Sequence, residues 1–528
     1  MKKVLRPVLA MATAAALVPA LAQERYLEEV FTNDQILVSP NIPYATNIDF
    51  LTSNFSVDPP VINTIELMMD IYEPDQAFDT ETARPLVIYA HTGDFLPPVI
   101  NGSPVGIRTD SCAVEMCMRM ARHGYVAASV SYRNGWRPDG ATLELRRGTL
   151  LNAVFRGLHD LKQSVRFLRE NAATTNDVAI DPNKVILIGE GTGGYMAQAY
   201  ISLDQGAEMF IEKFLPDPFE PTVSYIDTNV VGNIEGFGGA LNMYTDNGFP
   251  SEVQFAVNLG GALADSSWAD GGEAPLVSFH TVFDPFAPFG NGIVIVPTTQ
   301  EQVVPVSGSN ISQQIWNDLG NNASFASLPS GDPYTARARS LYGTTIQGVT
   351  ISPSPEGLFP FIRPRHTAPL QDEASPWQWW DPNSAAAMAT PPGAPAGVTT
   401  HQLSMASNPD MSGAKGRTYI DTIMGYMNPR IVCALNLGPC SLVGLDENSA
   451  IARGVEVFPN PASDRVTFTS TEAPILSYEI FDVNGRLVRT ARVNNTTAVM
   501  ERQGLKPGAY NVQLRFEDGA VARKLMLD

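Results

Sequence analysis

The stretch KVILIGEGTGG, residues 184–194, is the part of the sequence that decides the fold. Residues 184–188 are mostly apolar and have the length expected for a strand buried on both faces. Residues 189–199 predict a glycine-rich turn that opens a helix. A buried strand that passes through a tight turn directly into a helix is typical of α/β proteins.

Strands and helices alternate on both sides of this stretch. The sequence predicts a sheet flanked by helices, with strands over residues 65–72, 85–91, 125–133, 255–259 and 276–280, and helices over residues 112–123 and 151–170. This spacing favours the α/β fold class, with one mostly parallel sheet covered by helices on both faces.

The first residues have the composition of a cleavable signal peptide. Residues 1–22 begin with three basic residues, continue with an apolar run and end in Ala20-Leu21-Ala22. The alternative is a membrane anchor, but the run is shorter than the ~20 residues that span a bilayer and is broken by Pro19. No other apolar run approaches that length, so we expect no transmembrane helix in the mature chain.

Composition divides the rest of the chain. We expect a large α/β domain over residues 23–440, with an irregular insertion rich in Pro, Gly, Ser and Asn over about 290–410. A small-residue linker then covers residues 441–454. Residues 455–528 show short alternating runs separated by turns, which predict a small antiparallel β-sandwich.

The chain is strongly acidic. It has 35 Lys and Arg against 55 Asp and Glu, and its formal charge of −20 becomes −23 if residues 1–22, with three basic and no acidic residues, are removed. Such a balance favours solubility and repels nucleic acid and anionic lipid head groups. We therefore expect no nucleic-acid partner.

The four cysteines leave disulfide pairing open. Cys112 and Cys117 lie five residues apart on a predicted helix, where the rise of ~7.5 Å exceeds the usual Cα separation of a disulfide. Cys433 and Cys440 flank a Gly-Pro turn, and they either close a disulfide or remain buried thiols.

Four motifs near the C-terminus resemble a known export domain. They are VFPNPA at residues 457–462, IFDVNGR at 480–486, LKPGAY at 505–510 and KLML at 524–527. In this order they resemble the type A C-terminal sorting domain of the type IX secretion system. The resemblance implies that the secretion machinery is a partner and that the protein passes through the periplasm to the medium or the outer cell surface. An adhesion-type β-sandwich is the alternative.

Three motifs of the large domain also resemble a known superfamily. They are HTGDF at residues 91–95, SYR at 131–133 and IDPNKV at 180–185. Together they are similar to α/β-hydrolases, most of all to carboxylesterases and lipases. The resemblance implies ester hydrolysis by a serine in a Gly-x-Ser-x-Gly elbow, with an oxyanion hole at Thr92 and Gly93. Thr92 stands where this family has a glycine.

The elbow departs from the family pattern at its centre. Aligning Gly189-Glu190-Gly191-Thr192-Gly193 with Gly-x-Ser-x-Gly places Gly191 at the nucleophile position. The centre of an elbow has positive φ, which glycine adopts without strain, so the turn can persist after the attacking group is lost. Thr192 is the alternative nucleophile, although a hydroxyl in the first turn of a helix more often caps that turn.

The resemblance implies an acid and then a histidine further along the chain. Asp284 takes the acid position or, alternatively, caps a turn. His366 and His401 follow it in irregular sequence, and His366 is the preferred candidate, although loop histidines are more often solvated. His91 is expected to end its strand below the site with its ring hydrogen-bonded.

The remaining features narrow the function. Trp377, Trp379 and Trp380 either line a binding surface or pack the insertion. No metal-binding or phosphate-binding motif is present, so we expect no cofactor and no metal.

We expect a secreted or surface protein of the α/β-hydrolase fold that is non-catalytic or altered in mechanism, because loss of a triad serine lowers turnover by about 10⁶. Its ligand would be a small-molecule ester, a peptide or a glycan. The alternatives are an active ester hydrolase that uses Thr192 or another nucleophile, and a structural or adhesive surface protein.

Overall fold

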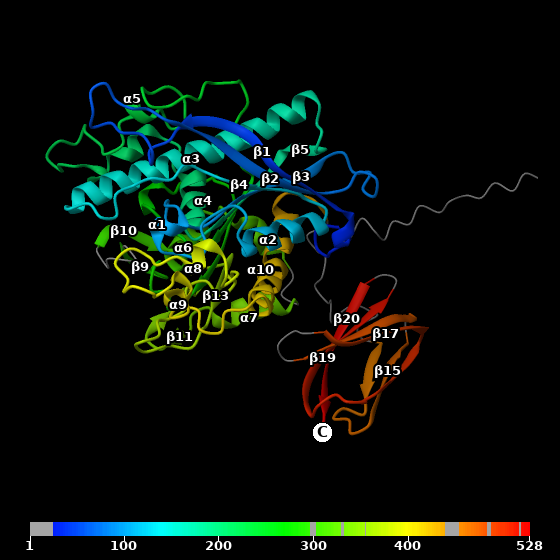
Figure 1. Cartoon of the computed structure of the whole chain (residues 1–528). Coiled ribbons are helices and arrows are strands. Elements are labelled where there is room, and N and C mark those ends of the chain that lie inside the picture. The colour runs from blue at the N-terminus through cyan, green and yellow to red at the C-terminus, as the bar shows by residue number, and fades with distance from the viewer. Residues whose placement is uncertain are drawn as a thin grey trace, which may run out of the picture.

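The computed structural model describes residues 25–295, 302–328, 332–353, 355–438, 454–471, 473–482, 487–516 and 519–528. The expected signal peptide over residues 1–22, Cys440 and nearly all of the expected linker over residues 441–454 lie outside these residues. Figure 1 shows a large α/β domain and a small all-β domain.

An eight-stranded sheet forms the centre of the α/β domain (Figure 1). Its strands are, in spatial order, β1 (Ile36–Ile48), β2 (Thr64–Pro74), β4 (Val126–Val130), β3 (Arg84–Ala90), β5 (Ile180–Glu190), β6 (Phe255–Leu259), β8 (Leu276–Thr281) and β13 (Leu358–Phe361). β2 pairs antiparallel with both of its neighbours, whereas the strands from β4 to β13 pair parallel. This order and these directions are those of the α/β-hydrolase fold, and the predicted mostly parallel sheet is confirmed.

The central strands are buried because their alternate residues face two separate cores. In β3, Leu86 and Ile88 pack into one core, and Val87 and Tyr89 pack into the other. The first core lies against α3 (Leu143–Thr174) and α4 (Thr192–Ser202), and the second against α2 (Ser111–Arg122) and α10 (Gly413–Ala434). Both faces of the sheet are therefore covered by helices.

The range 290–410, expected as an insertion, builds short elements and one strand of the central sheet. The short elements are β9 (Asn291–Ile295), β10 (Gln302–Gly308), α6 (Ser309–Asp318), η6 (Ala323–Ser327), α7 (Pro333–Leu341), β11 (Thr345–Ile346), β12 (Val349–Thr350), α8 (Ala385–Met388) and α9 (Thr400–Ser404). Because β13 pairs with β8 along the edge of the sheet, part of this range belongs to the core fold. Pro360 is tolerated within β13 because one side of an edge strand has no pairing partner.

Other short elements connect the strands on the N-terminal side of this range. They are η2 (Asn33–Gln35), α1 (Pro98–Asn101), η3 (Gly206–Phe210), η4 (Glu212–Phe214), α5 (Thr228–Val231), β7 (Ala262–Leu263) and η5 (Ser266–Trp268). β7 pairs with β10, which itself pairs with β9, in a separate three-stranded sheet.

The C-terminal domain is an antiparallel β-sandwich, as the alternating pattern predicts. One sheet has the order β14 (Val455–Phe458), β15 (Arg465–Ser470) and β18 (Thr497–Glu501), and the other has the order β17 (Leu487–Asn495), β16 (Ile475–Phe481), β19 (Gly508–Phe516) and β20 (Gly519–Leu527). Alternate apolar residues such as Phe468, Ile480 and Leu514 form one shared core.

Two sequence expectations concern cysteines and membrane helices. Cys112 and Cys117 are free and buried on α2, in line with their spacing. The proposed pairing of Cys433 with Cys440 stays a prediction, because Cys440 lies outside the described residues.

Within the described part of the chain, none of the helices combines the length and apolarity that a membrane crossing requires.

Candidate functional site

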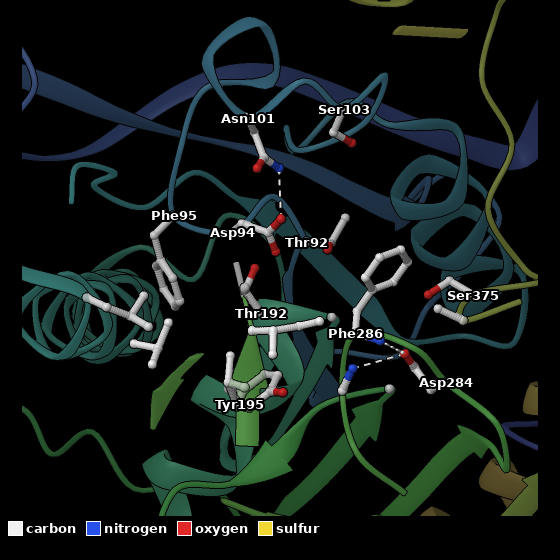
Figure 2. Close-up of a pocket in the computed structure, with 18 of the residues that line it drawn as sticks. Thr92, Asp94, Phe95, Asn101, Ser103, Thr192, Tyr195, Asp284, Phe286 and Ser375 are labelled. Carbon is white, nitrogen blue, oxygen red and sulfur yellow. Dashed lines mark hydrogen bonds between the residues drawn. The ribbon is translucent and has the colours of Figure 1, made fainter. Parts of the chain in front are cut away.

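A cavity of about 670 Å³ lies where the parallel strands end. Residues that follow β3, β5, β6 and β8 line it, namely Thr92, Gly191, Gly260 and Asp284. Figure 2 shows Thr92 and Asp284 around one space, together with Thr192 and Tyr195 from α4 and Ser375 from the segment after β13. The carboxyl ends of parallel strands are the usual ligand-binding edge of an open α/β sheet.

The turn between β5 and α4 keeps the backbone of a nucleophile elbow. Gly191 has φ 54° and ψ −115°, and its N–H donates to the Leu259 carbonyl at 2.8 Å. The elbow also packs closely against β3, because a Cβ on Gly193 would come within 2.8 Å of the Ala90 carbonyl carbon. The geometry of the turn therefore survives without a side chain at its centre.

Thr92 occupies the space in front of this turn. A Cβ built on Gly191 would overlap the hydroxyl oxygen of Thr92 and lie 2.9 Å from its Cβ. The space into which a nucleophile would project is therefore filled by a side chain from the segment that the sequence assigned to the oxyanion hole. Thr92 lines the cavity. Gly93 is not among the residues that line it, and its Cα region packs against Gly106.

Thr192 lines the cavity but lacks an activating base. Its hydroxyl lies 3.4 Å from the Tyr132 hydroxyl, its single side-chain partner among the described residues. Tyr132 also hydrogen-bonds the carbonyl of His91 at 2.8 Å, and burial raises its pKa, so it stays protonated. His91 lies beneath with its ring stacked on Tyr132 at 4.5 Å and donates from Nδ1 to the Thr92 carbonyl, as its position at the strand end predicts.

Asp284 stands in the loop after β8, at the acid position implied by the fold. Its Oδ1 accepts hydrogen bonds from the N–H groups of Phe286 at 2.8 Å and Ala287 at 3.0 Å. The side chain is 3 % exposed, and burial raises the pKa of the carboxyl to about 7. Both backbone bonds match the capping of a turn, the alternative interpretation of this residue.

The nearest histidine to Asp284 cannot serve as its triad partner. His280 Nε2 lies 3.6 Å from Asp284 Oδ2, yet this ring nitrogen donates to the Ala287 carbonyl at 3.1 Å, and Nδ1 pairs with the Ser309 hydroxyl at 2.7 Å. Burial lowers the pKa of His280 to about 4, so the ring is neutral at pH 7. It lies within β8, below the cavity.

No histidine in the described part of the chain lines the cavity. The backbone N–H of His366 donates to Asp372 Oδ1 at 2.7 Å in the loop after β13, and His366 does not line the cavity although Pro369 and Gln371 of the same loop do. His401 lies on α9, where Nδ1 accepts from the indole of Trp380 at 3.1 Å. The segment after β13 instead contributes Ser375, which is labelled in Figure 2 on the same side of the cavity as Asp284.

Several polar residues of the cavity were not among the sequence candidates, and two of them, Asp94 and Tyr195, are titratable. Asp94 has φ 53° and accepts from Asn101 Nδ2 at 3.0 Å, and burial raises the pKa of its carboxyl. Tyr195 lies on the first turn of α4, and its pKa is raised by burial and by the carboxylates of Asp284 and Asp94. The signal for Asp94 was a carboxylate four residues after a buried strand, whereas Tyr195 is ordinary helix sequence.

Glu190 connects the elbow to the segment after β13. This buried carboxylate accepts hydrogen bonds from the Tyr89 hydroxyl at 2.9 Å, the Trp377 indole at 3.1 Å and the Gln378 amide at 2.9 Å. Trp377 is therefore a core residue. Trp380 lines the cavity, so the tryptophan cluster divides between the two roles considered for it.

Comparison with known proteins identifies the C-terminal domain. Residues 456–528 match the family described as secretion system C-terminal sorting domain. The chain is also 32 % identical over 112 residues to an endo-acting ulvan lyase of Formosa agariphila, a match that covers 20 % of this chain and 21 % of that enzyme. The chain thus spans about a fifth of the length of this relative.

Solved structures similar to this chain are α/β-hydrolases. A thermophilic esterase of the planctomycete Thermogutta terrifontis, with propionate bound, is 16 % identical over 49 % of this chain and 76 % of its own, with a TM-score of 0.28. The α/β-hydrolase MGS-M1 from a deep-sea metagenome of the Medee basin is 13 % identical over 48 % and 72 %, with a TM-score of 0.26. Independently of these likenesses, the strand order of the central sheet is that of the α/β-hydrolase fold.

The class of protein follows from these findings. The chain joins a domain of the α/β-hydrolase fold to a type IX secretion sorting domain. It is therefore secreted or displayed at the outer cell surface, and the secretion machinery is one of its partners. Among the described residues, no cluster of His, Cys, Asp and Glu is arranged to hold a metal ion.

Proposed function

We propose that this protein is a secreted or surface ligand-binding protein that uses the α/β-hydrolase fold without serine-hydrolase catalysis. The observation that carries the proposal is the position of Thr92, whose side chain fills the space in front of Gly191. An esterase needs an attacking atom at that point. Gly191 supplies no such atom, and the Thr92 hydroxyl that fills the space has no histidine among the described cavity-lining residues to activate it.

The surroundings of the elbow support the same conclusion. A serine-type nucleophile needs a base within hydrogen-bond reach, and the described residues that line the cavity include no histidine. Asp284 has its acceptor oxygen Oδ1 bound by two backbone N–H groups. Even an installed serine would therefore lack the group that takes its proton.

The cavity itself supports a binding role. Its volume of about 670 Å³ is typical of small-molecule sites, and it combines apolar walls with a few convergent polar groups. A protein that had kept only the fold as a scaffold would gain nothing from an open cavity, because filling it with side chains stabilises the core. We therefore favour small-molecule binding over a purely structural role.

The proposal also includes export of the protein with cleavage of the signal peptide at residue 22.

The proposal is tested with a fluorophosphonate probe, which reacts with activated hydroxyl groups. The full chain is incubated with the probe next to an active serine esterase, and the adducts are measured by intact-protein mass spectrometry. We expect the esterase to be labelled stoichiometrically and this protein to remain unlabelled. A stoichiometric adduct that maps to Thr192 would instead identify an active hydrolase with a displaced nucleophile.

A further inference from the structure

The charged side chains that line the cavity are all of one sign. Among the described lining residues, Asp94 and Asp284 are the charged ones, and no Lys, Arg or His is present. They enter from two different strand ends, β3 and β8, and Figure 2 shows them on either side of the space above α4. The protein as a whole has a formal charge of −20, which adds to the negative potential.

Each carboxylate has one oxygen without a hydrogen-bond donor from the described residues. Asp284 Oδ1 accepts from two backbone N–H groups, whereas the Oδ2 atom has only the neutral His280 ring at 3.6 Å, beyond hydrogen-bond distance. Asp94 Oδ2 accepts from Asn101, and the other oxygen, Oδ1, has no donor in the described part of the chain. Neither oxygen is fully buried, and both residues line the cavity, so a ligand in the cavity can supply the missing donor or positive charge.

The opposite end of the cavity is apolar. α3 contributes Leu151, Val154 and Phe155, and β10 contributes further valines. Trp136 and Trp380 add aromatic surface to the cavity, and the Trp136 indole donates to the Asp94 carbonyl at 2.6 Å. Aromatic faces attract organic cations, and an apolar wall of this kind excludes water from an alkyl or aryl group.

We propose that the cavity binds an organic ammonium ion with an apolar body, held by Asp94 and Asp284 at its cationic end. The inference rests on the proposed non-catalytic binding function and adds the class of ligand. A cation supplies the positive charge that would pair with the two carboxylates, whereas a fatty acid or phosphate would place a further negative charge beside them. A neutral ester or alcohol could fill the apolar end but would leave both carboxylates unpaired.

The test compares three ligands of similar length that differ in charge. Hexyltrimethylammonium, 1-heptanol and heptanoate are titrated into the full chain at pH 8 by calorimetry, with tryptophan fluorescence as a second readout because Trp136 and Trp380 line the cavity. We expect the ammonium ion to bind about tenfold more tightly than heptanol, with heptanoate weaker still. Equal affinities of all three ligands, or no binding of the ammonium ion, would overturn the proposal.

Variants assign the effect to the two carboxylates. Asp284→Asn is expected to lower the affinity for hexyltrimethylammonium about tenfold and to leave the affinity for heptanol within about twofold. Glu66→Gln removes the same charge from an exposed position of β2 and should change neither affinity. If Asp284→Asn fails to fold, Asp94→Asn replaces it with the same expected result, and unchanged ammonium binding in the folded variant would contradict the proposal.

The pH dependence gives an independent readout, because the charge of hexyltrimethylammonium does not vary with pH. The titratable groups that face Asp284 are His280 from β8, Tyr195 from α4 and, across the cavity, Asp94. Since the pKa of Asp284 is about 7, ammonium binding should weaken as the pH falls from 8 to 5. Covalent labelling by the fluorophosphonate would refute the non-catalytic function, whereas a neutral ligand preference would refute only the ligand class.

Discussion

The hydroxyl of Thr92 stands where the side chain of residue 191 would project, and Gly191 has none. The two residues fit each other, because the Thr92 side chain occupies space that is free only while residue 191 is glycine. The family pattern places a glycine at the first position and a serine at the second, and here the small and the hydroxyl-bearing residue are exchanged. This pair determines what single and combined substitutions can do.

Gly191→Ser alone should lower stability without creating an esterase. The new Cβ collides with Thr92, and the serine has to adopt the positive φ of this turn. We therefore expect the free energy of unfolding to fall by about 1–3 kcal/mol. Urea unfolding and hydrolysis of p-nitrophenyl acetate measure the two effects. Adding Thr92→Gly should restore part of the stability by removing the collision.

A serine at Gly206 is the matched control, because a Cβ there has nothing within 4 Å. Gly206→Ser should change stability by less than about 0.5 kcal/mol. If Gly191→Ser proves equally harmless, the collision with Thr92 does not occur.

A base can be introduced at Ser375. The Thr281 hydroxyl donates to the Ala374 carbonyl at 3.1 Å, which brings the segment before Ser375 to the loop that carries Asp284. The triple variant Thr92→Gly, Gly191→Ser and Ser375→His should hydrolyse p-nitrophenyl esters about tenfold faster than the double variant without the histidine. The same rate in both variants would mean that a histidine at position 375 cannot reach the new serine.

Asp284 and Asp110 should contribute a stabilisation that falls as the pH rises from 5 to 8. Burial raises the pKa of Asp284 and of Asp110 to about 7, so the folded state binds protons that the unfolded state has already released. This contribution is complete below the unfolded pKa of about 4 and is lost as the pH rises through 7. It amounts to at most about 4 kcal/mol for Asp284.

Urea unfolding at pH 5 and pH 8 measures this slope. Asp284→Asn lacks the titrating carboxyl, so between pH 5 and pH 8 its stability should rise, relative to that of the unchanged protein, by the contribution of Asp284. Glu66→Gln, which removes an exposed carboxylate, should keep the full difference. An unaltered slope in Asp284→Asn would place the titrating group elsewhere.

Glu190 should contribute to stability through the three donors that it accepts from. Glu190→Ala leaves the Tyr89 hydroxyl, the Trp377 indole and the Gln378 amide without their acceptor, at a cost of about 2–4 kcal/mol. Glu190→Gln keeps one acceptor oxygen and should cost less. Calorimetric melting ranks the two variants, and a ranking in the reverse order would speak against this network.

The sequence predicted the sheet well where strands are long and buried. Residues 85–91 and 184–188 are apolar throughout most of their length because both faces of β3 and β5 are covered, and such runs need no tertiary information to be found. β13 was missed because its four residues include Pro360 and lie among turns. Short edge strands carry little local signal, since their pairing depends on β8.

The candidate site was predicted in part. Gly191, Thr192, Thr92 and Asp284 line one cavity, whereas His366 lies outside it and Gly93 is not among the lining residues. The blocking role of Thr92 depends on two segments about a hundred residues apart, which no local pattern connects. The sequence did show both exceptions to the family pattern, a threonine for a glycine and a glycine for a serine, but not that they touch.

The contact between these two positions also constrains how either of them can change. A serine at position 191 would meet the Thr92 side chain, and a residue smaller than threonine at position 92 would leave a void beside the glycine turn. Each single substitution is therefore expected to lower stability, whereas a paired exchange keeps the space filled. Selection for stability alone would couple the two positions, so that a residue accepted at one of them depends on the residue present at the other.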